Sequence, residues 1–160
     1  KKALRLVSRG AVGLVYLLYL GMLAWLALHR SEQLLPAAIV PAAAFLVGTL
    51  VRRVIDRPRP YTALGFAPLF PKDKPGQSMP SRHCFSAAAI AGAAWLVLRP
   101  LGIVLAVLGV LIAVCRVVTG VHYISDVLAG LAFGAVFAVL GWNAFVLAAS
   151  AMGFYSIMLL

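Results

Sequence analysis

The stretch VGLVYLLYLGMLAWLAL at Val12–Leu28 contains no charged residue, and its length is close to what one bilayer-spanning helix requires. Similar apolar runs follow at Leu35–Val51, Phe85–Leu98 and Leu101–Val118, and a fifth begins near His122. None of them shows the two-residue alternation of a membrane barrel. Because backbone amides in lipid must be hydrogen-bonded internally, each run predicts a helix. The sequence therefore predicts an all-α, polytopic membrane helix bundle.

The last apolar run, from Val127 to Leu160, is too long for one crossing of ordinary tilt. A turn at Gly141-Trp142-Asn143 would divide it into two spans. We therefore expect six transmembrane helices, with five as the alternative. The proline-rich segment Asp56–Pro80 lacks a long apolar run and is expected to be a loop, with a short interfacial piece around Tyr61–Phe70.

We expect residues 1–160 to form a single integral-membrane domain, because no internal repeat or low-complexity segment divides them. A cleavable signal peptide is not expected, because the first apolar run has no small-residue cleavage site followed by a soluble domain.

The composition restricts the class of partner. Hydrophobic residues make up 64% of the chain, more than in ordinary soluble domains. The net charge of +10, from 14 basic and 4 acidic residues, favours anionic partners. Nucleic acid is not expected, because the basic residues flank apolar runs and do not form a soluble basic face. A phosphorylated lipid within the bilayer fits both properties better.

Polar residues gather in three clusters, two of which flank the proline-rich loop. The first reads R-R-V-I-D-R-P-R-P at Arg52–Pro60 and, taken alone, is typical of a basic helix flank. The second is Pro80-Ser81-Arg82-His83, at the start of the third span. Ser81 is placed to cap that helix, and the free N–H groups of a helix start favour an anion.

The third cluster reads R-V-V-T-G-V-H-Y-I-S-D at Arg116–Asp126. His122 and Asp126 are four residues apart, so on a helix they would share one face. A carboxylate bonded to one imidazole nitrogen sets the tautomer of the ring. A hairpin arrangement of the spans would bring all three clusters to one membrane face. Arginines beside a histidine nucleophile suit a phosphoryl group.

The motifs Arg52-x6-Arg59-Pro60, Pro80-Ser81-x-His83 and Arg116-x5-His122-x3-Asp126 resemble the three-part signature of the type 2 phosphatidic acid phosphatase superfamily. The resemblance implies that His122 attacks phosphorus, that Asp126 orients it, and that His83 protonates the leaving oxygen. It implies phosphate-binding roles for Arg52, Arg59, Ser81, Arg82 and Arg116. It also implies that no metal or other cofactor is needed.

Three positions depart from the family pattern. Arg52 replaces the usual lysine and keeps its charge, and Cys115 stands where serine often precedes the third-motif arginine. Arg82 stands where glycine is common between the serine and the histidine. Its side chain would either contact a second phosphate or head group, or point to solvent.

The resemblance implies a membrane lipid phosphatase that acts on a phosphate monoester or diphosphate. Polyprenyl phosphates or pyrophosphates, phosphatidic acid and phosphatidylglycerol phosphate are all compatible substrates. A lipid phosphotransferase or a non-catalytic binder of anionic lipids would use the same arginines, but the binder would not need His83, His122 and Asp126 at these spacings. Basic residues predominate at the expected site face, which favours the cytoplasmic side of a bacterial plasma membrane. The oligomeric state stays open.

Overall fold

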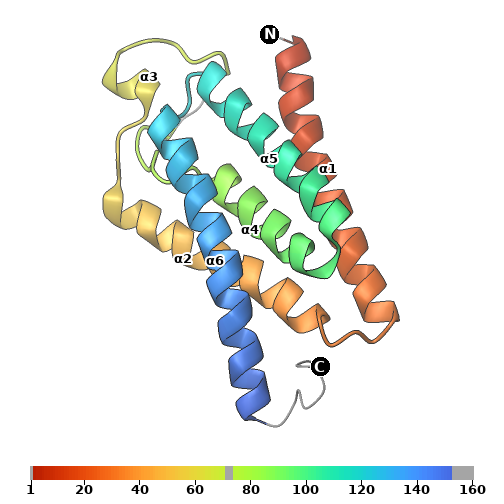
Figure 1. Cartoon of the computed structure of the whole chain (residues 1–160). Helices are drawn as coiled ribbons and strands as arrows, with labels where there is room; N and C mark the ends of the chain where they lie inside the picture. The colour runs from red at the N-terminus through yellow and green to blue at the C-terminus, as the bar shows by residue number, and fades with distance from the viewer. Residues whose placement is uncertain (1, 71–73, 153–160) are drawn as a thin grey trace.

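The computed structural model describes residues 2–70 and 74–152, which form five long helices and one short helix (Figure 1). No strand occurs in these two ranges. The all-α prediction is therefore confirmed. In chain order the helices are α1 (Lys2–Leu28), α2 (Leu34–Ile55), α3 (Pro60–Ala63), α4 (Arg82–Val97), α5 (Arg99–Val118) and α6 (Ile124–Ala151).

Four of the long helices, α1, α2, α5 and α6, are long and apolar enough to cross a bilayer. α4 has only 16 residues and is the most enclosed of the five, with half of its residues buried. It packs against α2, α5 and α6, which surround it. The protein is thus an integral membrane helix bundle with α4 at its centre.

The structure corrects the prediction of a sixth span. α6 continues without a break through Gly141-Trp142-Asn143, where the sequence suggested a turn. The Asn143 side-chain amide donates a hydrogen bond of 2.8 Å to the Val139 carbonyl one turn earlier, so the polar side chain is satisfied within the helix. Trp142 is buried against the bundle. The described part therefore has five long helices, and the remainder of the apolar run, from residue 153 onward, lies outside it.

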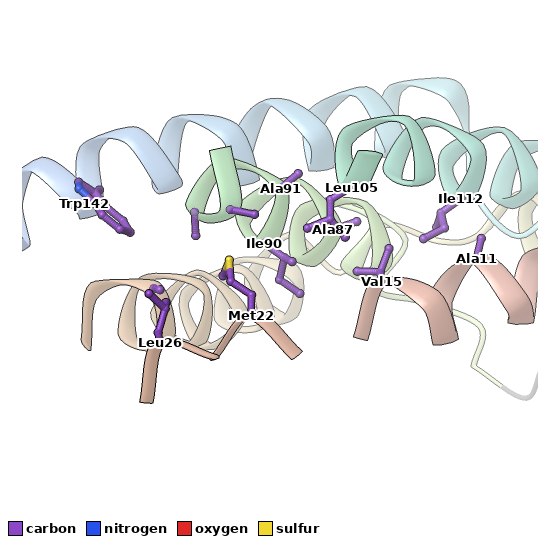
Figure 2. Packing of buried hydrophobic residues seen from close by; sticks show 13 residues of the cluster. Ala11, Val15, Met22, Leu26, Ala87, Ile90, Ala91, Leu105, Ile112 and Trp142 are labelled. Atoms are coloured by element: carbon purple, nitrogen blue, oxygen red, sulfur yellow. The ribbon is translucent and has the colours of Figure 1, made fainter. Parts of the chain in front are cut away.

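The apolar interior is built largely of small side chains on α4 and larger ones on its neighbours (Figure 2). Three residues of α4, Ala87, Ile90 and Ala91, lie between α1 on one side and α5 and α6 on the other. Leu105 of α5 is fully buried in the same cluster. Small residues let helix axes approach closely, which is how helices in lipid gain packing contacts without a hydrophobic driving force.

Two glycines set the approach of α6 to α4. A Cβ atom on Gly130 would lie 2.8 Å from the Ser81 carbonyl oxygen, and one on Gly134 would collide with the carbonyl of Phe85. The four-residue spacing of these glycines is the small-residue pattern of close membrane-helix pairs. At the end of this contact the Ser81 amide donates a 2.9 Å hydrogen bond to the Asp126 carbonyl. The starts of α4 and α6 are thereby held side by side.

The up-and-down order of the helices gathers all three polar clusters at one end of the bundle (Figure 1). The C-terminal ends of α2 and α5 and the N-terminal ends of α4 and α6 meet there, below the loop that carries α3. The N-terminal end of α1 lies at the same end. With five long helices, the C-terminal end of α6 lies at the opposite end.

Candidate active site

His122 and Asp126 form the buried centre of the site. Their exposed fractions are 5% and 0%, and His122 Nδ1 lies 3.5 Å from Asp126 Oδ2. The sequence predicts that both residues lie on one face of a helix, but His122 precedes α6, which begins at Ile124. Gly120, with φ +72°, makes the turn that brings the histidine back over the helix start. The predicted pair therefore forms, although by a loop rather than by a helical face.

Both carboxylate oxygens of Asp126 have partners besides the histidine. Oδ1 accepts a hydrogen bond from Arg57 Nη1 at 2.8 Å. Oδ2 accepts one from the Tyr123 backbone amide at 3.0 Å and a short one from the Ser78 hydroxyl. A carboxylate that is buried and held on both oxygens cannot rotate freely. Asp126 is therefore suited to hold the imidazole of His122 in one orientation.

Arg57 and Ser78 contact the site but are not among the residues that the sequence predicts for it. Arg57 belongs to the dense arginine cluster, so the pattern contained a signal, but it did not show which arginine reaches the aspartate. Its guanidinium also lies 4.2 Å from the centre of the Tyr123 ring and donates to the Ser125 hydroxyl at 2.8 Å. Ser78 carried no signal, because a serine in a proline-rich loop is ordinary.

Arg52 and Arg59 are nearly buried, at 7% and 4% exposure, although both are cationic. Arg52 Nη2 donates to the Gln77 carbonyl, and Arg59 Nε donates to the Gly76 carbonyl at 3.1 Å. Both guanidinium groups are thus anchored to the backbone of the same loop. They also lie close enough to Arg82 for the three charges to repel one another. Such a concentration of charge favours an anion between them.

Several polar atoms at this end are buried without a hydrogen-bond partner among the described residues. They are Arg52 Nε, Ser81 Oγ and Arg116 Nε, with Ser86 Oγ further along α4. Ser81 precedes α4 as expected, but its hydroxyl does not cap the helix. Unsatisfied buried donors are costly, so they indicate a ligand that accepts hydrogen bonds. All three site residues were predicted to bind phosphate.

His83 and Arg116 line a cavity of about 570 Å³ at the same end of the bundle. The other lining residues are Arg5, Ser8, Arg9, Val12 and Phe70. His122 does not line this cavity and lies buried among the loop residues. Arg82 does not line the cavity either, and its exposed side chain lies 5.9 Å from the centre of the Phe45 ring. His83 therefore faces the cavity, whereas His122 faces the buried carboxylate of Asp126.

Burial lowers the pKa of the His122 imidazole below its ordinary value, and nearby Arg59 and Arg52 lower it further. The contact with Asp126 acts in the opposite direction but does not overcome burial. His122 is therefore neutral near pH 7. A neutral imidazole with Nδ1 directed at a carboxylate leaves Nε2 as a free nucleophile.

The site is a buried His–Asp pair surrounded by arginines at one end of a membrane helix bundle. A membrane protein with such a site is suited to bind a phosphoryl or similar anionic group. The family comparison agrees with this geometry, since the model of the PAP2 superfamily matches residues 33–150. The chain belongs to the PAP2 superfamily. The match includes all three polar clusters but not α1.

Two bacterial relatives illustrate the similarity in sequence. A lipid A 1-phosphatase of Rhizobium johnstonii is 36% identical over 100 residues, which cover 59% of this chain and 41% of that protein. A decaprenylphosphoryl-5-phosphoribose phosphatase of Mycobacterium tuberculosis is 35% identical over 122 residues, which cover 74% of this chain and 65% of that protein. The aligned region thus spans between two fifths and two thirds of these relatives.

Two solved structures share the fold. A transmembrane PAP2 type phosphatidylglycerolphosphate phosphatase from Bacillus subtilis superimposes with a TM-score of 0.69 over 92% of this chain and 76% of its own, at 23% identity. Aquifex aeolicus LpxE superimposes with a TM-score of 0.66 over 89% of this chain and 93% of its own, at 21% identity. The helical arrangement is therefore that of membrane PAP2 proteins.

Proposed function

We propose that the protein removes phosphate from a membrane lipid through a phosphohistidine intermediate on His122. The observation that carries this proposal is the His122–Asp126 pair, buried and oriented on both carboxylate oxygens. A lipid-binding protein needs cationic side chains, but it does not need a neutral histidine held by a carboxylate. The phosphatases among its relatives support the same activity.

In the first step, Nε2 of His122 attacks phosphorus while the bond to the lipid oxygen breaks. His83 donates a proton to that oxygen, so the lipid leaves as an alcohol, or as a monophosphate if the substrate is a diphosphate. The arginine side chains of Arg52, Arg59 and Arg116 stabilise the charge on the phosphoryl oxygens. Asp126 stabilises the imidazolium that forms as His122 becomes phosphorylated.

In the second step, His83 removes a proton from water, and the resulting oxygen attacks phosphorus. The P–N bond breaks, inorganic phosphate leaves, and His122 returns to its neutral form. The donors on Arg52, Ser81 and Arg116 that lack protein partners would bind the phosphoryl oxygens in both steps. No free energy is needed to reorganise these donors during the reaction, because the fold already holds them in place.

A chain of cavities supports a lipid as the substrate. The large cavity shares Val12 and His83 with a narrow neighbour of about 20 Å³. That neighbour shares Tyr16, Ser86 and Ile90 with a third cavity of about 180 Å³, which extends to Phe45 of α2. The polar end of this path holds His83, and its far end lies between apolar helices. An amphiphile could place its phosphate at one end and its tail at the other.

The candidate substrates are lipid phosphate monoesters and diphosphates. The names of the relatives include a lipid A phosphatase, a decaprenylphosphoryl-phosphoribose phosphatase and a phosphatidylglycerolphosphate phosphatase, so the scaffold accommodates different head groups. Polyprenyl diphosphates, phosphatidic acid and phosphatidylglycerol phosphate are the classes to test first. The hydrogen-bond donors described above would bind the phosphate group that all of these lipids share.

Two other functions would use the same residues. A phosphotransferase would pass the phosphoryl group from His122 to a lipid or sugar hydroxyl instead of to water. A non-catalytic binder of anionic lipids would use Arg52, Arg59 and Arg116 without turnover. The order of the His83, His122 and Asp126 motifs favours the hydrolase over the binder, whereas only the product separates hydrolase from transferase.

The deciding experiment is phosphate release by purified protein from a panel of lipid phosphates and diphosphates in detergent. His122→Ala, tested in parallel, should release none, while a short incubation of wild-type protein with labelled substrate should trap phosphate on His122. Activity should survive EDTA if the site works without a metal. Full turnover by His122→Ala would rule out the phosphohistidine route. Transfer to an added alcohol without release would identify a transferase.

We also propose that the site faces the cytoplasm at the plasma membrane of a bacterium. Ten described basic residues lie at the site end, and only Arg30 and Arg99 lie at the other; Lys1 and Lys72 are outside the described ranges. Loops rich in lysine and arginine stay on the cytoplasmic side. A reporter fused after α6 should then be active outside the cell, because that end of the bundle is opposite the site.

A further inference from the structure

The large cavity beside His83 is lined on one side by α1. Arg5, Ser8, Arg9 and Val12 face the cavity from that helix, opposite His83 and Arg116. Their spacing of three, four and seven residues from Arg5 places all four on one helical face. In Figure 1 the N-terminal end of α1 diverges from α5 toward the site end. α1 thus directs the guanidinium groups of Arg5 and Arg9 into the cavity that His83 also lines.

The cavity is strongly electropositive. Three arginines line it, and none of the described lining residues is acidic. Neither Arg5 nor Arg9 forms an ion pair with a described carboxylate. The guanidinium of Arg5 lies 4.7 Å from the centre of the Phe70 ring, which positions it at the wall of the cavity. Among the described residues, no carboxylate neutralises these two charges.

The cavity is also larger than one phosphoryl group needs. Its volume is about 570 Å³, while one water molecule occupies about 30 Å³ of liquid. The phosphate under attack must reach both His122, which does not line the cavity, and His83, which does, so it lies at the His83 side of the cavity. The space along Arg5 and Arg9 is therefore additional to the position of the reacting phosphate.

We infer that Arg5 and Arg9 form a second anion-binding subsite, which selects lipids that carry another phosphate beside the one removed. This inference rests on the proposed function, because it places the reacting phosphate at His122 and His83. The second phosphate would belong either to a diphosphate or to a head group phosphorylated at another position. The guanidinium groups of Arg5 and Arg9 can each donate two hydrogen bonds to the oxygens of this second phosphate. α1 lies outside residues 33–150, the range that matches the family model.

A simpler explanation is that Arg5 and Arg9 are only basic flanks of a membrane helix. Flanking charges attract anionic lipids in general and do not distinguish one phosphate from two. Arg53 provides a matched comparison, because it is an exposed arginine at the same end of the bundle that does not line the cavity. Replacing Arg53 by a neutral residue therefore measures the effect of losing a flanking charge that does not line the cavity.

The test compares kcat/KM for three lipids with the same tail: a monophosphate, a diphosphate, and a lipid with two phosphates on separate carbons. The proteins are wild type, the double variant Arg5→Gln/Arg9→Gln, its charge-conserving partner Arg5→Lys/Arg9→Lys, and Arg53→Gln. The double glutamine variant should lose on the order of tenfold for a doubly phosphorylated lipid. It should change by less than about twofold for the monophosphate. The lipid with the larger loss identifies the spacing of the two phosphates.

The lysine variant should keep most of the preference, and Arg53→Gln should match wild type. An equal loss for all three lipids, or the same loss in Arg53→Gln, would overturn the subsite. A second measurement separates this inference from the catalytic proposal. Binding of a non-hydrolysable lipid bisphosphonate and the matching monophosphonate is measured in the His122→Ala background. If no lipid is hydrolysed by wild type, loss of bisphosphonate preference in the double variant would still support the subsite, and an unchanged preference would refute it.

Discussion

The guanidinium of Arg57 lies 2.8 Å from the carboxylate of Asp126, although 69 residues separate them in the sequence. The contact joins the proline-rich loop after α2 to the start of α6. The aspartate is fully buried, while the arginine side chain is 34% exposed. Arg57 therefore contacts the proposed catalytic pair from the solvent side, through the oxygen of Asp126 that does not face His122.

Replacing Arg57 by glutamine should lower kcat on the order of tenfold, because Asp126 would lose one of the contacts that hold His122 in position. The stability loss should be about 1 kcal/mol, less than for a fully buried pair, since Arg57 is 34% exposed. Phosphate release and thermal unfolding in detergent measure the two effects. KM should change little, because Arg57 does not line the cavity.

A double-mutant cycle checks that Arg57 acts through Asp126. In an Asp126→Asn background, adding Arg57→Gln should have little further effect on kcat, because the two residues share one interaction. Arg57→Lys should restore part of the activity. Independent, additive losses would show that Arg57 acts on the substrate directly.

Ser78→Ala should lower kcat severalfold and destabilise the protein by about 1 kcal/mol. Its hydroxyl donates to Asp126 and lies 3.4 Å from His122 Nδ1, so its removal leaves one carboxylate oxygen less firmly held. Ser150→Ala is a suitable control, because that hydroxyl bonds only within α6 at the opposite end of the bundle. Wild-type kcat in Ser78→Ala would show that the remaining contacts suffice to orient the pair.

The activity should persist at pH values below the ordinary pKa of histidine, about 6.5. Burial lowers the pKa of His122, so the proposed nucleophile stays neutral as the pH falls past that value. The acid limb of kcat/KM should therefore have its midpoint below 6.5. An acid limb centred at or above 6.5 would contradict a buried, neutral nucleophile.

The same shift makes a prediction about stability. The folded protein binds a proton at His122 less readily than the unfolded chain, so the contribution of this group is fully present above about pH 6.5. It is lost as the pH falls toward the lowered pKa of the folded state. In His122→Gln, this part of the acid destabilisation should disappear, which unfolding measurements between pH 5 and 7 would detect.

Gly130→Ala should reduce both stability and activity. The added Cβ would lie 2.8 Å from the Ser81 carbonyl and 3.0 Å from Cys84 Cβ, so α4 and α6 would have to separate. That movement would shift Ser81 and His83 relative to Asp126. Gly13→Ala is the matched control, since a Cβ there meets nothing within 4 Å. It should leave activity unchanged and stabilise α1 by roughly 0.5–1 kcal/mol.

The sequence alone predicted a helical membrane bundle, because hydrophobicity over a window of about 20 residues is a local property. It also indicated the His122–Asp126 pair, because the two residues are only four apart in the sequence, although a turn at Gly120 and not a helical face brings them together. The number of long helices differs from the six spans that the sequence predicts. Local composition suggested a turn at Gly141-Trp142-Asn143, whereas α6 remains continuous because Asn143 is satisfied by its own helix.

Tertiary structure decided which basic residues serve which purpose. In the run Arg52–Pro60, sequence alone does not show that Arg57 turns toward Asp126 while Arg52 and Arg59 are anchored to loop carbonyls. The path of the proline-rich loop determines that choice. Likewise, Arg5 and Arg9 resemble ordinary flanking charges until α1 is placed beside His83. Contacts between residues far apart in the chain depend on how whole helices pack, and no local pattern records that packing.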